Sequence, residues 1–110
     1  MNYIDFTAGS NEYKLRLNTR AIVTLEKTLG CNPLAIFGNG DTIPSVTQMV
    51  AVLHASLQSL NHGITMDKAY DIYDAWLADG HAMTDFLAVI IDIYRASGLI
   101  GNEANEGKNA

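Results

Sequence analysis

The sequence predicts a mainly helical α+β domain in which an N-terminal β-hairpin packs on a small bundle of about four helices. The first residues alternate apolar and polar side chains, as strands do, whereas later segments repeat apolar residues at helical spacing. Glycines and helix-capping residues separate these segments. Because the chain has 110 residues, we expect a single globular domain over residues 1–100. The end, residues 101–110, is polar and is expected to be a flexible tail.

The hairpin is expected to pair residues 3–8 with residues 12–17. Between the two strands, "AGSN" offers Gly9, which tolerates the backbone angles of a turn. The alternation gathers apolar side chains on one face of each strand: Ile4, Phe6, Tyr13, Leu15 and Leu17. Because two strands alone are marginally stable, we expect this face to lie on the helices that follow.

The first helix is expected to begin at Asn18 or Thr19, whose side chains can cap it, and to end at Gly30. A short helical turn in "CNPLAIF" follows it. The second helix is expected to start at about Pro44 and to run to Asn61. Its apolar stripe comprises Val46, Met49, Val50, Leu53, Leu57 and Leu60.

The third helix is expected to begin after Thr65 as its cap and to end at Gly80. The fourth is expected to begin after Thr84 as its cap and to end at Gly98. Because this last helix is apolar nearly all round, we expect it in the middle of the fold.

The net charge of −5 lies entirely in the second half of the chain. Residues 56–110 hold eight acids and three bases, whereas residues 1–55 hold four of each. An acidic surface without a basic patch argues against nucleic acid and against anionic membranes as partners. No apolar run approaches the roughly 20 residues that cross a bilayer. We expect no signal peptide, and the lone Cys31 suits a reducing cytosol.

No pattern in the sequence predicts a catalytic, cofactor or metal site. The residues that could have formed one are His54, His62, His81, Asp67, Asp71, Asp74 and Cys31. The histidines do not have the i, i+4 spacing of a helical zinc pair, and a calcium loop needs carboxylates on a tight turn rather than on a helix. The three aspartates share the polar face of their helix. A general acid needs a carboxyl group whose pKa is raised by an apolar pocket, and none of the three lies in one. We therefore expect a protein that is not an enzyme.

Aromatic and aliphatic side chains on the last two helices are the candidates for binding another protein. Tyrosine and tryptophan on an exposed face favour partner binding, and the same residues in a small domain also form cores. The candidate partner-binding residues are Tyr70, Tyr73, Trp76, Leu87 and Ile91. The sequence leaves open which of them are exposed.

Three long strings support a resemblance to a known class of protein. They are "EYKLRLNTRAIVTLEKTLGCNPLAIF", "LHASLQSLNHGITMDKAYDIYDAWLADG" and "FLAVIIDIYRASG", in this order. Over about residues 2–100, the chain resembles the small tail assembly chaperones of siphophages and prophages of Gram-positive bacteria.

The resemblance implies a non-catalytic chaperone that binds the phage tape measure protein and assists polymerisation of the tail tube protein around it. It implies no cofactor and no catalytic residue, a location in the host bacterial cytoplasm, and absence from the mature virion. Self-association stays open. The alternatives are a small cytosolic helical adaptor, such as an antitoxin-like regulatory domain, and a small enzyme built on the Asp and His residues.

Overall fold

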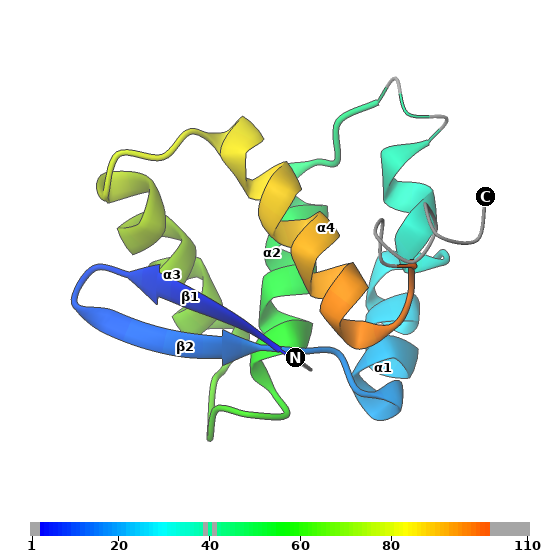
Figure 1. Ribbon diagram of the computed structural model, residues 1–110, viewed down its shortest axis with the longest axis horizontal. Coiled ribbons are helices and arrows are strands. Elements are labelled where there is room, and N and C mark those ends of the chain that lie inside the picture. The colour runs from blue at the N-terminus through cyan, green and yellow to red at the C-terminus, as the bar shows by residue number, and fades with distance from the viewer. Residues whose placement is uncertain (1–2, 39, 41, 102–110) are drawn as a thin grey trace.

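The computed structural model describes residues 3–38, 40 and 42–101 (Figure 1). These residues form a two-stranded hairpin followed by four α-helices and two short 3-10 helices, which confirms the predicted fold class. The elements are β1 (Ile4–Ala8), β2 (Asn11–Leu15), α1 (Thr19–Leu29), η1 (Pro33–Phe37), α2 (Val46–Leu57), α3 (Met66–Ala78), η2 (Met83–Asp85) and α4 (Phe86–Ser97). All but one residue of the predicted tail, 102–110, lie outside the described part.

The hairpin has the predicted strands to within two residues. Ala8 pairs with Asn11, so the loop between the antiparallel strands contains only Gly9 and Ser10. Gly9 has a φ of 62°. A two-residue loop of the II′ type needs a positive φ at its first position, which glycine adopts without strain.

The apolar face of the hairpin packs on the helices, as predicted. Phe6 stacks on Trp76 of α3 with ring centroids 5.9 Å apart and meets the edge of Phe86 of α4 at 6.1 Å. Leu15 and Leu17 are also buried. Two hydrogen bonds fix the hairpin at its ends. The Gly9 N–H donates to Asp79 Oδ2 at 2.7 Å, and the Leu17 N–H donates to Ser97 Oγ at 2.8 Å.

The central helix is α2, and the prediction that the last helix occupies the middle is wrong. Helix α2 packs against α1, α3, α4 and β2, and α4 lies across it (Figure 1). The buried residues of α2 run without a break from Met49 to Leu53 and resume at Ala55. Helix α4 buries a narrower stripe, which comprises Phe86, Ile90, Ile93 and Tyr94. Its remaining apolar side chains, such as Leu87 and Ile91, stay partly exposed.

Helix α2 is shorter than predicted at both ends. It begins at Val46 because Ser45 caps it: Ser45 Oγ accepts from the Gln48 N–H, while the Gln48 side chain accepts from the Ser45 N–H. This reciprocal pair is a capping box. The helix ends at Leu57, four residues before the predicted Asn61, and Leu60 is 45 % exposed. The predicted apolar stripe was therefore too long.

The predicted cap at Thr84 is also wrong. The chain enters α4 through the 3-10 turn η2, and the side chain that satisfies a free N–H there is Asp85, whose Oδ2 accepts from Ala82 at 2.8 Å. The caps at Asn18 and Thr65 and the left-handed glycines Gly30 and Gly98 are as predicted. Among the described residues, no helix is long and apolar enough to span a membrane.

Candidate partner-binding groove

Two of the five predicted partner-binding residues belong to the core. Tyr73 and Trp76 are each only 4 % exposed, and both rings contact Phe86, at centroid distances of 5.4 and 5.3 Å. His81 stacks on Trp76 at 4.2 Å with the two rings nearly parallel. In this conformation the two side chains hold α3, α4 and the hairpin together and offer no surface to a partner.

The other three predicted residues do not form one surface with them. Tyr70 is 48 % exposed and lies beside residues of α1 and α2. Leu87 is partly buried on α4 and packs against the core, and Ile91 is partly buried on the same helix. The structure thus separates the predicted set into two core residues, two half-buried residues on α4, and Tyr70.

Tyr70 borders one of two hollows that follow each other along the seam between α1 and α2. The hollow beside Tyr70 has a volume of about 290 Å³. Its lining residues come from the end of α1, the start of α2 and the start of α3: Thr28, Leu29, Thr47, Gln48, Ala51, Met66 and Tyr70.

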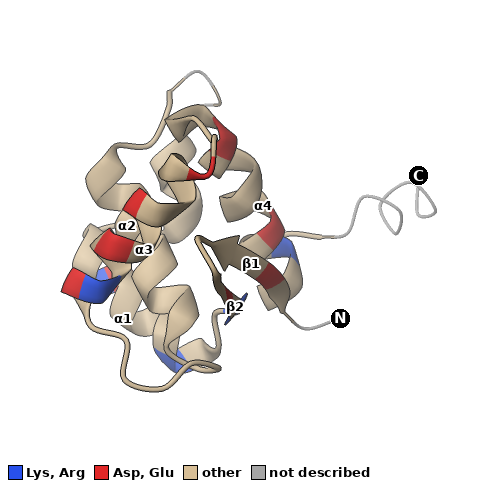
Figure 2. Cartoon of the chain, turned by 90° about the vertical axis from the view of Figure 1, so that its left-hand side faces the viewer, with Lys and Arg blue, Asp and Glu red and all other residues tan. Residues whose placement is uncertain are grey.

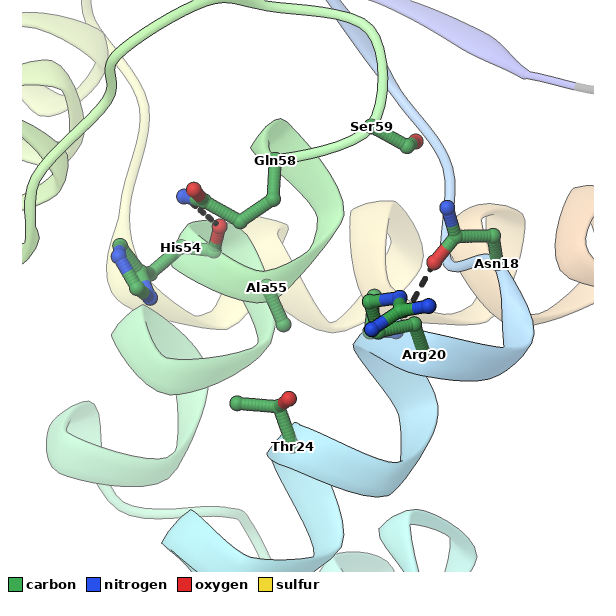
Figure 3. Close-up of a pocket in the computed structure, with 8 residues that line it drawn as sticks. Asn18, Arg20, Thr24, His54, Ala55, Gln58 and Ser59 are labelled. Carbon is green, nitrogen blue, oxygen red and sulfur yellow. Dashed lines mark hydrogen bonds between the residues drawn. The ribbon is translucent and has the colours of Figure 1, made fainter.

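The other hollow lies between the start of α1 and the end of α2 and has a volume of about 340 Å³ (Figure 3). It is lined by Asn18, Arg20, Ala21, Thr24, His54, Ala55, Gln58 and Ser59. Sequence reasoning missed these residues. The small side chains at helical spacing on both helices do not identify them, because a tightly packed helix has the same pattern.

The two hollows lie next to each other along the seam between α1 and α2, and we refer to them together as the α1–α2 groove. Thr24 and Ala55 line the first hollow, and one turn further along each helix Thr28 and Ala51 line the second. Because the early part of α1 lies against the late part of α2, the helices run antiparallel. Ala51 and Ala55 are 4 % and 5 % exposed and form the floor.

Local hydrogen bonds hold one end of the groove, where α1 begins and α2 ends, in place. Asn18 Oδ1 accepts from the Ala21 N–H at 2.9 Å and so fixes the start of α1. At the end of α2, Gln58 Nε2 donates to the backbone oxygens of His54 and Ile64. Ser59 Oγ donates to the Arg16 carbonyl at 3.2 Å. Asn18, Gln58 and Ser59 therefore line the groove and also hold the backbone of its walls in position.

The groove carries a different charge from the rest of the molecule. None of its lining residues is Asp or Glu, and one of them, Arg20, is a cation. In contrast, acidic residues gather on α3 (Figure 2), where Asp67, Asp71 and Asp74 are all exposed as predicted. The acidic side chains of the described residues therefore lie outside the lining of this groove.

The three histidines lie in different surroundings. Among the described residues, no three His, Cys, Asp or Glu side chains lie close enough to hold a metal ion. His54 lines the groove, His62 is exposed in the turn after α2, and His81 covers Trp76. Burial raises the pKa of Tyr73 and of Tyr94, so both phenols stay protonated and neither is a base.

Comparison with known proteins gives a family but no activity. The chain matches a family of unknown function, DUF6096, over residues 5–110, and it therefore belongs to that family. No curated protein and no solved structure matches it significantly.

Proposed function

We propose that this DUF6096 protein is a non-catalytic tail assembly chaperone that binds a phage tape measure protein and assists tail tube polymerisation. Two kinds of observation support the proposal. The first is the resemblance of the three long strings to such chaperones. The second is the α1–α2 groove, which has the form of a binding surface rather than of an active site.

The groove is the observation that carries the proposal. A chaperone for a long helical protein needs apolar surface that is accessible before the client arrives. The groove offers the half-exposed ring of Tyr70 on its rim and the partly exposed side chains of Leu29 and Met66 beside it. Tyrosine at the edge of a hollow is a frequent anchor for a partner, because it combines a large apolar ring with a polar tip.

The acidic part of the molecule would keep a loaded complex dispersed. The exposed aspartates of α3 repel similar molecules, and net charge far from zero opposes association. In this proposal the chaperone acts in the host bacterial cytoplasm, the tail tube protein is a second partner, and the mature virion lacks the chaperone.

Co-expression with the tape measure protein tests the proposal. The client is the product of the very long gene that is expected downstream of the chaperone gene, whereas the gene for the major tail protein is expected upstream. We expect the wild-type chain to raise the soluble yield of the tape measure protein. We expect Tyr70→Asp to abolish that rescue while the chaperone itself stays folded.

Val23→Asp is the matched control, because Val23 is an exposed apolar residue of α1 outside both hollows. It should leave the rescue intact. If the tape measure protein is equally insoluble with and without the wild-type chain, the chaperone proposal fails and an adaptor for another client is the better interpretation.

A further inference from the structure

The two ends of the α1–α2 groove differ in chemistry. Arg20 lies at one end, whereas Leu29, Met66 and Tyr70 lie at the other. We propose that the groove binds an α-helix of the partner that has an acidic side chain at the Arg20 end and a large apolar side chain at the Tyr70 end. This inference rests on the proposed function and specifies the client segment.

The shape of the groove fits a helix. Its walls and floor are helical side chains, and the backbone groups of α1 and α2 are bonded within their own helices, so no edge is available to pair with a strand. The lining residues of α2 and the turn after it extend from Thr47 to Ser59, which corresponds to roughly 18 Å, or about three turns, if measured along a helix.

The floor allows the close approach that helix packing requires. Helix axes in contact lie about 8–10 Å apart, and the smaller values need small side chains at the contact. Ala51 and Ala55 supply them at i, i+4 spacing on one face of α2. Thr24 and Thr28 supply short side chains on the facing wall of α1.

The charge of the groove selects an acidic helix. The Arg20 side chain is exposed, and it makes no ion pair or hydrogen bond with any of the described residues. No carboxylate lines the groove to compete for it. An arginine guanidinium binds a carboxylate with two parallel hydrogen bonds, which is geometrically specific as well as attractive. A basic helix would meet Arg20 without any compensating acid.

The spacing of the two ends gives the client pattern. Arg20 and Thr28 lie about 12 Å apart along α1, which is about two helical turns. The partner helix should therefore carry Asp or Glu about seven or eight positions from a large apolar residue. The order of the acidic and the apolar residue along the partner helix then determines the direction in which that helix lies in the groove.

The test uses the co-expressed tape measure protein and two variants with matched controls. Arg20→Glu reverses the charge at the groove, and Lys27→Glu makes the same change elsewhere on α1. Thr24→Trp fills the groove from an exposed position on its wall, and Val23→Trp places the same ring on the neighbouring residue outside both hollows. Circular dichroism melts show that each variant is folded.

We expect Arg20→Glu to weaken binding of the tape measure protein about tenfold or more, since attraction becomes repulsion. Thr24→Trp should abolish binding, and both controls should bind like the wild type. If the wild type rescues the client and all four variants rescue it equally, the groove inference is overturned while the chaperone function stands. If the wild type rescues nothing, the function fails and the inference falls with it.

Discussion

Two buried tyrosines allow the same substitution to be tested in opposite environments. The Tyr94 hydroxyl donates to the Pro33 carbonyl at 2.8 Å, between α4 and η1, and Tyr94 and Pro33 are both buried. The Tyr73 hydroxyl is also buried, but it has no hydrogen-bond partner among the described residues. Each tyrosine can be changed to phenylalanine, which removes only the oxygen.

The expected effects differ in sign. Tyr94→Phe removes a hydrogen bond between two buried residues, so the variant should lose about 0.5–1.5 kcal/mol of stability. Tyr73→Phe removes a polar atom that is buried without compensation. The variant should therefore be as stable as the wild type or more stable by up to about 1 kcal/mol.

Thermal and urea unfolding followed by circular dichroism measure both changes. For a domain of this size, a loss of 1 kcal/mol lowers Tm by about 4 °C. The reasoning would be refuted by equal losses in the two variants, because the only difference invoked between them is the partner of the hydroxyl. A stable Tyr94→Phe variant would show that the contact with Pro33 contributes nothing.

Three further predictions concern the hairpin, alkaline pH and the histidines. Deleting residues 1–17 removes the buried Phe6, Leu15 and Leu17 and should unfold the domain; a deletion variant that melts like the intact chain would contradict this. Burial, with a smaller effect of the Asp74 charge, raises the pKa of Tyr73, and burial raises that of Tyr94. The folded state therefore holds these protons more tightly, and its stability should be complete below about pH 10 and fall above it. Unfolding titrations from pH 8 to 12 should show a smaller fall for Tyr94→Phe. His62 and His81 lie outside the α1–α2 groove, so the variants His62→Asn and His81→Ala should bind the client like the wild type, with stability losses within about 0.5–3 kcal/mol. Stoichiometric zinc in untagged wild-type protein, or loss of client binding in both variants, would refute this.

Features set by local chemistry could be predicted from the sequence. Asn18 and Gly30 act within one or two turns of their own positions, so α1 has the predicted start and end. The alternation in the hairpin likewise identified its buried face. The cap at Thr84 failed because an equally local competitor, the Asp85 carboxylate, accepts the Ala82 N–H.

Whether each aromatic residue of α3 is buried or exposed depends on the face of the helix on which it lies. Tyr73 and Trp76 lie on the same side as the buried Ala69, whereas Tyr70 lies four positions before the exposed Asp74 and shares its face. These two faces of α3 could be assigned from the helical spacing in the sequence. What the sequence could not reveal is that Phe6 of a distant strand and Phe86 of the next helix enclose Trp76.

The α1–α2 groove could not be predicted because it arises between helices. Small residues such as Ala51 and Ala55 are compatible with a helix packed tightly on all sides. Only the placement of α1, α3 and α4 around α2 decides which side of the helix stays open.

Site-specific photo-crosslinking tests the central claim most directly. A photoreactive amino acid is placed at Thr24, inside the groove, or at Val23, outside it, in cells that also express the tape measure protein. We predict that the probe at position 24 joins the chaperone to a helical segment of the tape measure protein, and that the probe at position 23 does not. Crosslinks to the tape measure protein from position 23 alone, or from neither position in a soluble complex, would contradict the account.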